Sequence, residues 1–341
     1  MSPLPPASIL AAWKLADRSC ETVSGGHINL TFRVRDISGD LCLQRLNPIF
    51  DPKLHEDLQA ITEHLHRKGL ATPRLQPSAG GRLWEKDEQG GIWRVMNWME
   101  GEILLAADGP DRCREAGRLL GTFHAALWDL DHPFRARRLG VHDTAAHLTK
   151  LEQALRQEQV APDIQTLGQN ILETACDLQL PNQLPERIVH GDPKISNLLF
   201  WPDGRAHCWV DLDTLAPMPL AIELGDALRS WCSPAGEESK AYFDASFFKA
   251  AMEGWLDSMG SLPTTEEKEA ILPWCAGVAV ELSARFCADA YHESYFGWDP
   301  TRYASAAEHN LLRARSQLTL AHSILAQKDR LQTILDKLGI A

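Results

Sequence analysis

The stretch that decides the fold is residues 188–213, which read I-V-H-G-D-P-K-I-S-N-L-L-F-W-P-D-G-R-A-H-C-W-V-D-L-D. Two short apolar runs, L-L-F and C-W-V, flank the turn sequence P-D-G at residues 202–204. Proline presets φ for a turn and glycine supplies a positive φ, so the pattern predicts a β-hairpin. Such a hairpin brings Asn197, which precedes its first strand, close to Asp211, at the end of its second.

The polar side chains of this stretch are the groups that phosphoryl transfer needs. Asn197 and Asp211 supply hard oxygen ligands, which suit Mg²⁺ bound together with substrate phosphates. Asp192 remains to accept a proton, and its spacing to Asn197 is that of the catalytic loop of protein kinases. Lys194 falls where many kinases place a phosphate-contacting lysine, and His190 completes the set of candidate catalytic residues.

The H-G-D form of the loop, followed by V-D-L-D at 210–213, resembles the aminoglycoside phosphotransferase and choline kinase superfamily. The resemblance implies an α+β, protein-kinase-like bilobal fold. Its small N-terminal lobe has an antiparallel sheet with one main helix, and its larger C-terminal lobe is mostly helical. The apolar run that passes into M-E-G-E at 99–102 resembles the hinge of this superfamily. We therefore expect a nucleotide-binding lobe over residues 1–100 and a catalytic and acceptor-binding lobe over residues 101–341.

The bulk composition is that of a globular protein without a polyanionic partner. The 341 residues are 44% hydrophobic and 23% charged, and their formal net charge is −12. This acidic balance offers no electrostatic footprint for a nucleic-acid polymer or an anionic membrane. The N-terminus lacks the features of a signal peptide, and no run approaches the length of a membrane span. Eight cysteines without a C-x-x-C indicate reduced thiols in a cytoplasmic protein.

Periodicity predicts the main elements of both lobes. Residues 31–35 alternate as a strand, and 41–46 follow a turn as the next strand. Apolar residues recur at three to four residues over 51–68, which predicts a helix that ends at Gly69. Further helices are expected at 111–130, 142–179, 240–259 and 265–292.

The resemblance also assigns nucleotide contacts. Gly25 and Gly26 lie in a predicted hairpin that would cover the ATP phosphates with backbone N–H groups, although an ordinary turn explains two glycines equally well. The backbone near Met96 and Trp98 would hold the adenine ring.

The strand at 41–46 departs from the superfamily pattern because it lacks the phosphate-binding lysine. Gln44 or Arg45 occupies the expected place, and Arg45 or Lys194 would supply the missing charge. Glu56 or Glu63 of the following helix would pair with that cation, unless both are simply solvated helix charges.

Five segments narrow the resemblance to the N-acetylhexosamine 1-kinase group, in which the strand glutamine recurs. They are G-G-H-I-N-L-T-F from 25, L-Q-R-L-N-P-I-F from 43, V-D-L-D-T-L-A-P from 210, E-L-S-A-R-F-C-A-D-A-Y from 281 and N-L-L-R-A-R-S-Q-L from 310. Such enzymes transfer the ATP γ-phosphoryl group to the anomeric hydroxyl of GlcNAc or GalNAc. The expected partner is therefore a small amino-sugar acceptor.

This resemblance suggests roles for several further residues. Arg285 would grip ring hydroxyls or an acetamido carbonyl with its guanidinium fork, or form a salt bridge with Glu281 one turn back. His27 and Asn29 would face the acceptor or the phosphates, or shape a turn. Asp213 would add a metal ligand directly or through water, and Asp226 would buttress the catalytic loop.

Two alternatives remain open at this stage. The first is a kinase for another hydroxyl acceptor, such as an aminoglycoside, choline or a different sugar; the acidic chain suits a cationic acceptor, whereas Arg285 does not. The second is a non-catalytic kinase-like binding module. Retention of Asp192, Asn197 and Asp211 argues against this second alternative.

Overall fold

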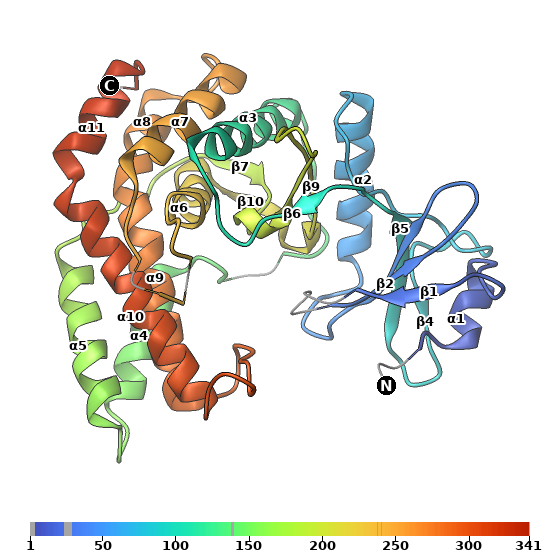
Figure 1. Ribbon diagram of the computed structural model, residues 1–341, viewed down its shortest axis with the longest axis horizontal. Coiled ribbons are helices and arrows are strands. Elements are labelled where there is room, and N and C mark those ends of the chain that lie inside the picture. The colour runs from blue at the N-terminus through green and yellow to red at the C-terminus, as the bar shows by residue number, and fades with distance from the viewer. Residues whose placement is uncertain (1–3, 24–28, 138–139, 237, 240, 341) are drawn as a thin grey trace.

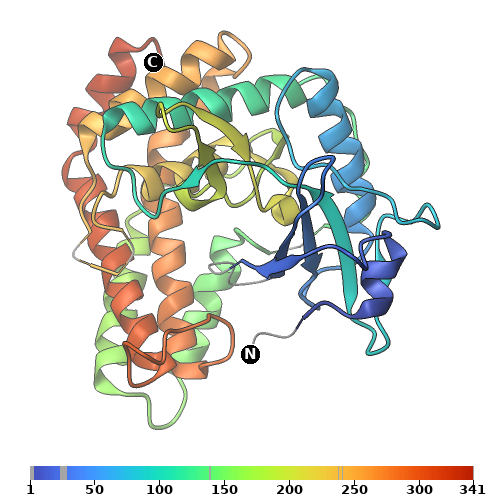
Figure 2. The ribbon, with the colours of Figure 1, turned by 45° about the vertical axis from the view of Figure 1, so that its right-hand side comes forward.

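The computed structural model describes residues 4–23, 29–137, 140–236, 238–239 and 241–340. A sheet-containing lobe lies at the N-terminal end of the molecule and a larger helical lobe at the C-terminal end, with helix α2 standing at the junction between them (Figures 1 and 2). The expected bilobal, kinase-like α+β fold is confirmed. The division at residue 100 remains a prediction.

The N-terminal lobe is built on an antiparallel sheet whose strand order is β1-β2-β3-β5-β4 in the described part of the chain. One face of this sheet carries Phe32, Leu43 and Val95, which pack with Ile9 and Trp13 of and beside helix α1. Because side chains alternate along a strand, the other face presents a different set of residues toward the helical lobe. The elements are α1 (Ala7–Ala12), β1 (Cys20–Thr22), β2 (Leu30–Val34), β3 (Leu41–Arg45), β4 (Glu85–Lys86) and β5 (Ile92–Asn97).

Helix α2 (Leu54–Arg67) joins the two lobes through its apolar stripe. Leu58, Ile61 and Leu65 are buried in one cluster with residues of α3 (Pro110–Leu127). Gly69 follows with φ +85°, a conformation that glycine adopts at low cost after a helix. The predicted helix over 51–68 is therefore confirmed in type and place.

Two small sheets carry the stretch at 188–213. Strands β8 (Leu198–Phe200) and β9 (Ala206–Trp209) form the hairpin that the P-D-G turn predicts, and β6 (Glu102–Ile103) pairs with β8. Strand β7 (Glu186–Val189) leads into the loop and pairs with β10 (Ala216–Pro219), which leaves it. Both ends of the stretch are thus held by backbone hydrogen bonds.

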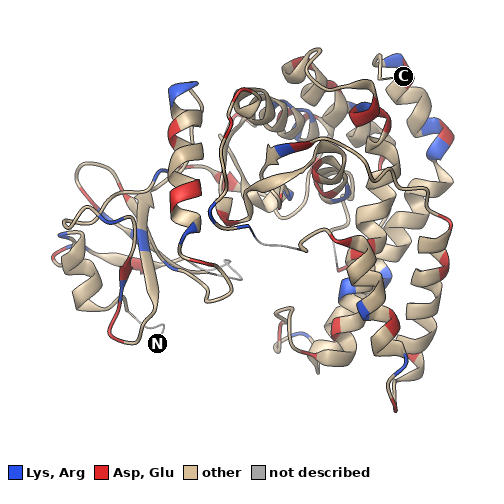
Figure 3. Ribbon diagram, turned by 180° about the vertical axis from the view of Figure 1, so that it is seen from behind, with Lys and Arg blue, Asp and Glu red and all other residues tan. Residues whose placement is uncertain are grey.

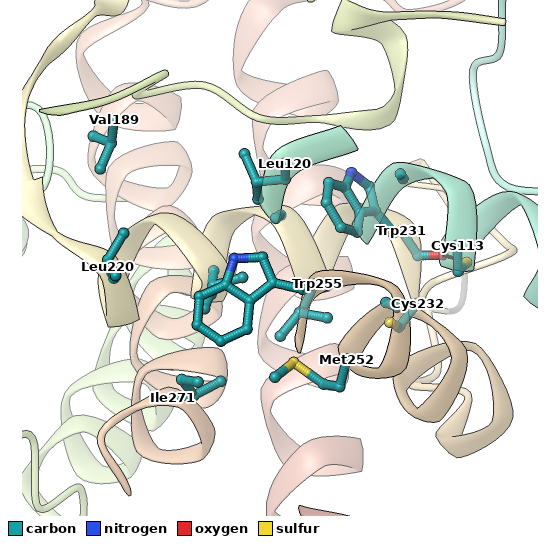
Figure 4. Close-up of a cluster of buried hydrophobic side chains, with 14 of the residues drawn as sticks. Cys113, Leu120, Val189, Leu220, Trp231, Cys232, Met252, Trp255 and Ile271 are labelled. Carbon is teal, nitrogen blue, oxygen red and sulfur yellow. Dashed lines mark hydrogen bonds between the residues drawn. The ribbon is translucent and has the colours of Figure 1, made fainter. Parts of the chain in front are cut away.

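The core of the helical lobe lies where α3 meets α6 (Leu220–Trp231) and α7 (Ala245–Met259). Trp231 and Trp255 are buried there with Leu120, Met252 and Cys113 (Figure 4). The Cys113 thiol donates a hydrogen bond to the carbonyl oxygen of Trp231 at 3.4 Å. The remaining elements are α4 (Thr144–Leu155), α5 (Pro162–Cys176), α8 (Thr265–Glu269), α9 (Ile271–His292), α10 (Ala306–Ala326) and α11 (Lys328–Lys337).

Helix α9 corrects one expectation from the sequence. It is 22 residues long and apolar enough to cross a membrane by length and composition alone. However, 89% of its most apolar window is buried among the other helices, which marks it as the central helix of the lobe. Basic and acidic residues are interspersed along the ribbon of both lobes (Figure 3).

Candidate active site

The loop after β7 has a backbone that only glycine can supply at its centre. Gly191 has φ +81°, and a Cβ atom there would lie 2.1 Å from the carbonyl oxygen of Thr214. The hydroxyl of Thr214 in turn donates a hydrogen bond to the carbonyl oxygen of His190 at 2.9 Å. The H-G-D sequence therefore allows a close crossing of two chain segments beside Asp192.

Glu223 of α6 holds this loop in place through its carboxylate. Its two carboxylate oxygens accept hydrogen bonds from the backbone N–H groups of His190 and Gly191, each at 2.9 Å. Burial alone would raise the pKa of Glu223, but hydrogen bonds from His124 and from the backbone N–H of Gly191 hold it below its ordinary value. The sequence interpretation gave this task to Asp226, which instead accepts a hydrogen bond from Arg229 at 2.8 Å.

We expect Glu223→Gln to lower the free energy of unfolding by about 2 kcal/mol. The carboxamide has one oxygen acceptor for two backbone donors, so one buried N–H group loses its partner. Thermal and urea unfolding measure the loss, and Glu253→Gln, which removes a carboxylate paired with Arg114 at the surface, is the matched control. Equal stability of the two variants would contradict the role of Glu223.

His190 supports the loop from inside the protein. Its ring is fully buried against Trp209, with ring centroids 4.9 Å apart, and its Nε2 lies 3.0 Å from the carbonyl oxygen of Val210. Burial lowers its pKa, so the imidazole stays neutral at physiological pH. Its Nδ1 accepts a hydrogen bond from the backbone N–H of Asp192 at 3.3 Å, which suits His190 to position that residue.

Asp192 has one carboxylate oxygen held by two donors. Lys194 Nζ lies 2.7 Å from Oδ2, and Asn197 Nδ2 lies 3.1 Å from the same atom. Burial alone would raise the pKa of Asp192, but the ammonium group of Lys194 outweighs it and keeps the pKa below its usual range. Its side chain is 25% exposed, so an ionised carboxylate is accessible to a substrate hydroxyl.

The hairpin brings Asn197 and Asp211 together as the sequence predicts. The backbone N–H of Val210 donates to the carbonyl oxygen of Asn197 at 2.9 Å. The amide nitrogen of the Asn197 side chain donates to Asp192, which leaves Oδ1 as the atom that could bind a metal. Burial raises the pKa of Asp211 to about 6, and the carboxylates of Asp213 and Asp192 push it in the same direction. A cation beside Asp211 would offset this repulsion.

Asp213 already has a positive partner. The guanidinium of Arg94, on β5, forms a bidentate pair with its carboxylate, with N–O distances of 2.5 and 2.9 Å. Asn29 Nδ2 donates to Oδ2 at 2.6 Å. Burial alone would raise the pKa of Asp213, but Arg94 holds it below its usual range. Both oxygens of Asp213 thus accept hydrogen bonds from the N-terminal lobe.

Gln44 and Arg45, the two candidates for the place of the phosphate-binding lysine on β3, lie on opposite faces of the sheet. Gln44 pairs with Arg94 across β3 and β5, whereas Arg45 pairs with Trp93 on the face that α1 covers. The Arg45 guanidinium lies 3.8 Å from Asp87. In this structure Arg45 therefore points away from Asp213.

Helix α2 does not supply the acidic partner that was considered for the phosphate-site cation. Glu56 is exposed and lies 3.9 Å from Arg135, and Glu63 accepts a hydrogen bond from Gln59 on the same exposed face. Both side chains are thus the solvated helix charges that the sequence also allowed.

The remaining nucleotide candidates fall into two groups. Met96 is buried at the end of β5, in the cluster that spans both lobes, and the Trp98 ring carries the Arg33 guanidinium 4.6 Å from its centroid. Their adenine contacts remain predictions. Gly25, Gly26 and His27 lie outside the described residues.

Arg285 lines a pocket of about 400 Å³ at the C-terminal end of α9. Its guanidinium lies 3.8 Å from Glu281 and 5.7 Å from the centre of the Phe296 ring. Glu281 lies closer to His142, with 3.0 Å between Glu281 Oε1 and His142 Nδ1. The other lining residues are Gly140, Val141, His147, Lys150, Gln153, Ala288, Asp289, His292, Ser294 and Tyr295.

Asp289, the acidic residue that lines this pocket, forms hydrogen bonds with the loop that follows α9. Asp289 accepts hydrogen bonds from the backbone N–H groups of Ser294, Tyr295 and Phe296 and from the side chain of Asn310. The pocket consequently presents basic and aromatic groups rather than free carboxylates.

A loop that carries an ionised aspartate, beside an asparagine and a second aspartate and beneath a sheet-borne arginine, defines a kinase-like phosphotransferase site. The chain belongs to the phosphotransferase enzyme family: the family model matches residues 19–257.

Two solved structures share the fold of this chain. The chain is similar to an aminoglycoside phosphotransferase from Alicyclobacillus acidocaldarius, with a TM-score of 0.62 and 15% identity over 97% of this chain and 98% of that chain. It is also similar to the amicoumacin kinase hAmiN in complex with AMP-PNP, Ca²⁺ and Ami, with a TM-score of 0.62 and 15% identity over 88% and 87% of the two chains. At these identities the similarity shows the fold alone.

A curated relative is the homoserine kinase of Methylobacterium radiotolerans, which is 29% identical over 174 residues. The match covers 50% of this chain and 51% of the relative. The chain thus spans about half the length of the curated relative that it matches.

Proposed function

We propose that the chain is a cytoplasmic ATP-dependent kinase that phosphorylates a sugar hydroxyl, namely the anomeric hydroxyl of an N-acetylhexosamine such as GlcNAc or GalNAc. The observation that carries phosphoryl transfer is the ionised Asp192, with one oxygen held by Lys194 and Asn197. An anomeric hydroxyl is more acidic than an ordinary alcohol. A carboxylate of low pKa therefore suffices to accept its proton as the new P–O bond forms.

The donor set beside Asp192 fits a divalent cation bound together with nucleotide phosphates. Within the described residues, no group of three or more His, Cys, Asp or Glu residues forms a metal site of its own. Mg²⁺ is usually bound by one or two carboxylates together with substrate phosphates, and Asn197 and Asp211 match that need. The cation would neutralise charge on the transferring phosphoryl group. The complex of the amicoumacin kinase with AMP-PNP and Ca²⁺ supports this proposal.

Positioning and charge dominate the chemistry that falls to this chain. Asp192 orients the acceptor hydroxyl and takes its proton, while Lys194 keeps that carboxylate ionised. Glu223 and Gly191 hold the loop so that Asp192 keeps its place. Such preorganisation avoids the cost of reorienting dipoles during the reaction.

The pocket around Arg285 supports a neutral sugar over a cationic acceptor. It presents the basic side chains of Arg285 and Lys150, together with the aromatic side chains of Tyr295 and Phe296. A guanidinium donates to hydroxyl and acetamido oxygens, and it repels the ammonium groups of aminoglycosides and choline. The volume of the pocket, about 400 Å³, lies within the range of small-molecule sites.

We expect Arg285→Met to raise the KM for the sugar by about tenfold or more and to leave the KM for ATP unchanged. Methionine keeps the apolar stem and removes the hydrogen-bond donors that would bind the acceptor. Arg315→Met is the control, because this arginine pairs with Asp163 at the surface. A rise in KM for both substrates would show instead that the substitution disturbs the helical lobe.

An ADP-release screen tests the proposed acceptor class. We expect turnover with GlcNAc and GalNAc, and little with plain hexoses, choline, aminoglycosides or homoserine. Product formed only from aminoglycosides, choline or homoserine would overturn the sugar assignment but keep the kinase. Protection by ATP without ADP release from any acceptor would instead indicate a binding module.

A further inference from the structure

We propose that Arg94 of β5 is the phosphate-binding cation of the nucleotide site, in place of the strand lysine that β3 lacks. The ligand is the α- and β-phosphate group of a nucleoside di- or triphosphate. This inference rests on the proposed nucleotide-dependent function, and it concerns a residue that lies outside the loop at 188–213.

The position of Arg94 follows from the register of the sheet. It lies directly opposite Gln44, on the face that looks toward the helical lobe, and its side chain is only 2% exposed. Gln44 Oε1 accepts hydrogen bonds from Arg94 Nε at 3.0 Å and from Nη2 at 2.7 Å. Because an arginine has donors only, these contacts fix which end of the Gln44 carboxamide faces it.

Gln44 is thereby committed to holding Arg94. Its amide nitrogen donates to the hydroxyl of Thr31 at 3.0 Å, and its oxygen is used by the guanidinium. The positive charge that β3 lacks is consequently supplied by Arg94 of the neighbouring strand β5. Gln44 serves as the orienting neighbour of the cation rather than as a phosphate donor.

The acidic partner of this cation also differs from the one in protein kinases. Protein kinases pair the lysine of β3 with a glutamate of the helix that follows it. In this chain Asp213, which lies in the short helical turn η2 (Leu212–Thr214), is the acidic partner of Arg94. The ion pair therefore links the N-terminal sheet directly to the segment that begins at Asp211.

Helix α2 places a neutral group near this pair. Burial and the charge of Arg94 lower the pKa of His55 to about 4, and Asp213 acts on it in the opposite direction. The ring is completely buried, and its Nε2 has no hydrogen-bond partner in the described part of the chain. An uncharged imidazole leaves the guanidinium as the positive charge beside the Asp213 carboxylate.

Arg94 retains a donor for an incoming phosphate. Among the described residues, its hydrogen bonds to Gln44 and Asp213 use four of the five N–H groups of a guanidinium, and the second N–H of Nη1 has no partner there. The ion-pair partner of Arg94, Asp213, lies two residues beyond the candidate metal ligand Asp211. The cation thus faces the same space as the candidate metal ligand, where phosphates would lie.

The test is calorimetric binding of ADP and of adenosine to the full chain in EDTA, so that metal binding plays no part. Arg94→Met alone would leave Asp213 buried without a partner, so the central variant is Arg94→Met with Asp213→Asn, which removes both charges. A third substitution, Gln44→Lys, then returns a positive charge to β3. Arg82→Met, which removes an arginine paired with Glu85 in the same lobe, is the control.

We expect the double variant to bind ADP about 10- to 100-fold more weakly, with adenosine affinity within twofold of the unaltered protein. Gln44→Lys should restore most of the ADP affinity, and Arg82→Met should change neither ligand. Unaltered ADP affinity in the double variant, or equal weakening for ADP and adenosine, would overturn the role of Arg94. Absence of ADP binding to the unaltered protein would overturn the proposed function itself, which is a distinct result.

Discussion

Asp192→Asn is expected to lower kcat by at least about 10²-fold, the scale of losing a general base, with little effect on the fold. Asparagine is isosteric, and its carboxamide oxygen still accepts hydrogen bonds from Lys194 and Asn197. It has no oxygen basic enough to take the proton of the acceptor hydroxyl. The chemical step is therefore expected to slow while nucleotide binding is retained.

The measurement is steady-state turnover with the best acceptor of the ADP-release screen, with circular dichroism as a check of folding. Asp203→Asn is the matched control, because Asp203 lies in the exposed P-D-G turn and bonds to Arg205. Turnover of the Asp192 variant within a few-fold of normal would remove Asp192 from the catalytic role. A proportional loss in the control variant would point to a general effect on the hairpin.

The sequence predicted most where neighbouring residues carry the information. The loop at 188–213, its hairpin and the helix before Gly69 are local patterns, so spacing and turn chemistry were sufficient. The bilobal fold followed from resemblance to a family with the same motifs. These features required no knowledge of which strands pair across long stretches of the chain.

The sequence predicted least where long-range pairing decides the chemistry. Arg94 lies 50 residues beyond Gln44, and only the β3–β5 register brings the two together. Arg45 was weighed equally with Gln44, but adjacent residues on a strand point to opposite faces. Glu223 reaches its backbone partners across more than 30 residues, and no local spacing marks it. Leu43 lies on the face that α1 covers, so alternation along the strand places Arg45 on that same face and Gln44 on the other.

Asp211→Asn is the second substitution with a large expected effect, and activity and stability should change in opposite directions. The loss of the charged oxygen ligand that we propose beside the transferring phosphoryl group is expected to lower kcat by about 10²-fold or more. The backbone should not change, because Asp211 has φ 60° and ψ 52°, a left-handed conformation that asparagine tolerates well.

The stability gain follows from the sign of the pKa shift. Burial and two neighbouring carboxylates raise the pKa of Asp211 to about 6 in the folded protein, from an ordinary value of 3.8. A carboxyl group with a raised folded pKa binds its proton more tightly in the native state, so stability falls as pH rises through that range. Without metal at pH 8, ionised Asp211 should cost on the order of 2–3 kcal/mol, which asparagine removes.

Thermal unfolding in EDTA checks this directly. We expect Asp211→Asn to unfold at a temperature several degrees above that of the unaltered protein at pH 8, and the difference to shrink toward zero at pH 4. Asp203→Asn should show no such pH-dependent gain, because Asp203 is exposed in its turn. A variant of Asp211 that is less stable at pH 8 would mean that the carboxylate is stabilised by a neighbour. A variant that keeps full activity would mean that the metal ligands lie elsewhere.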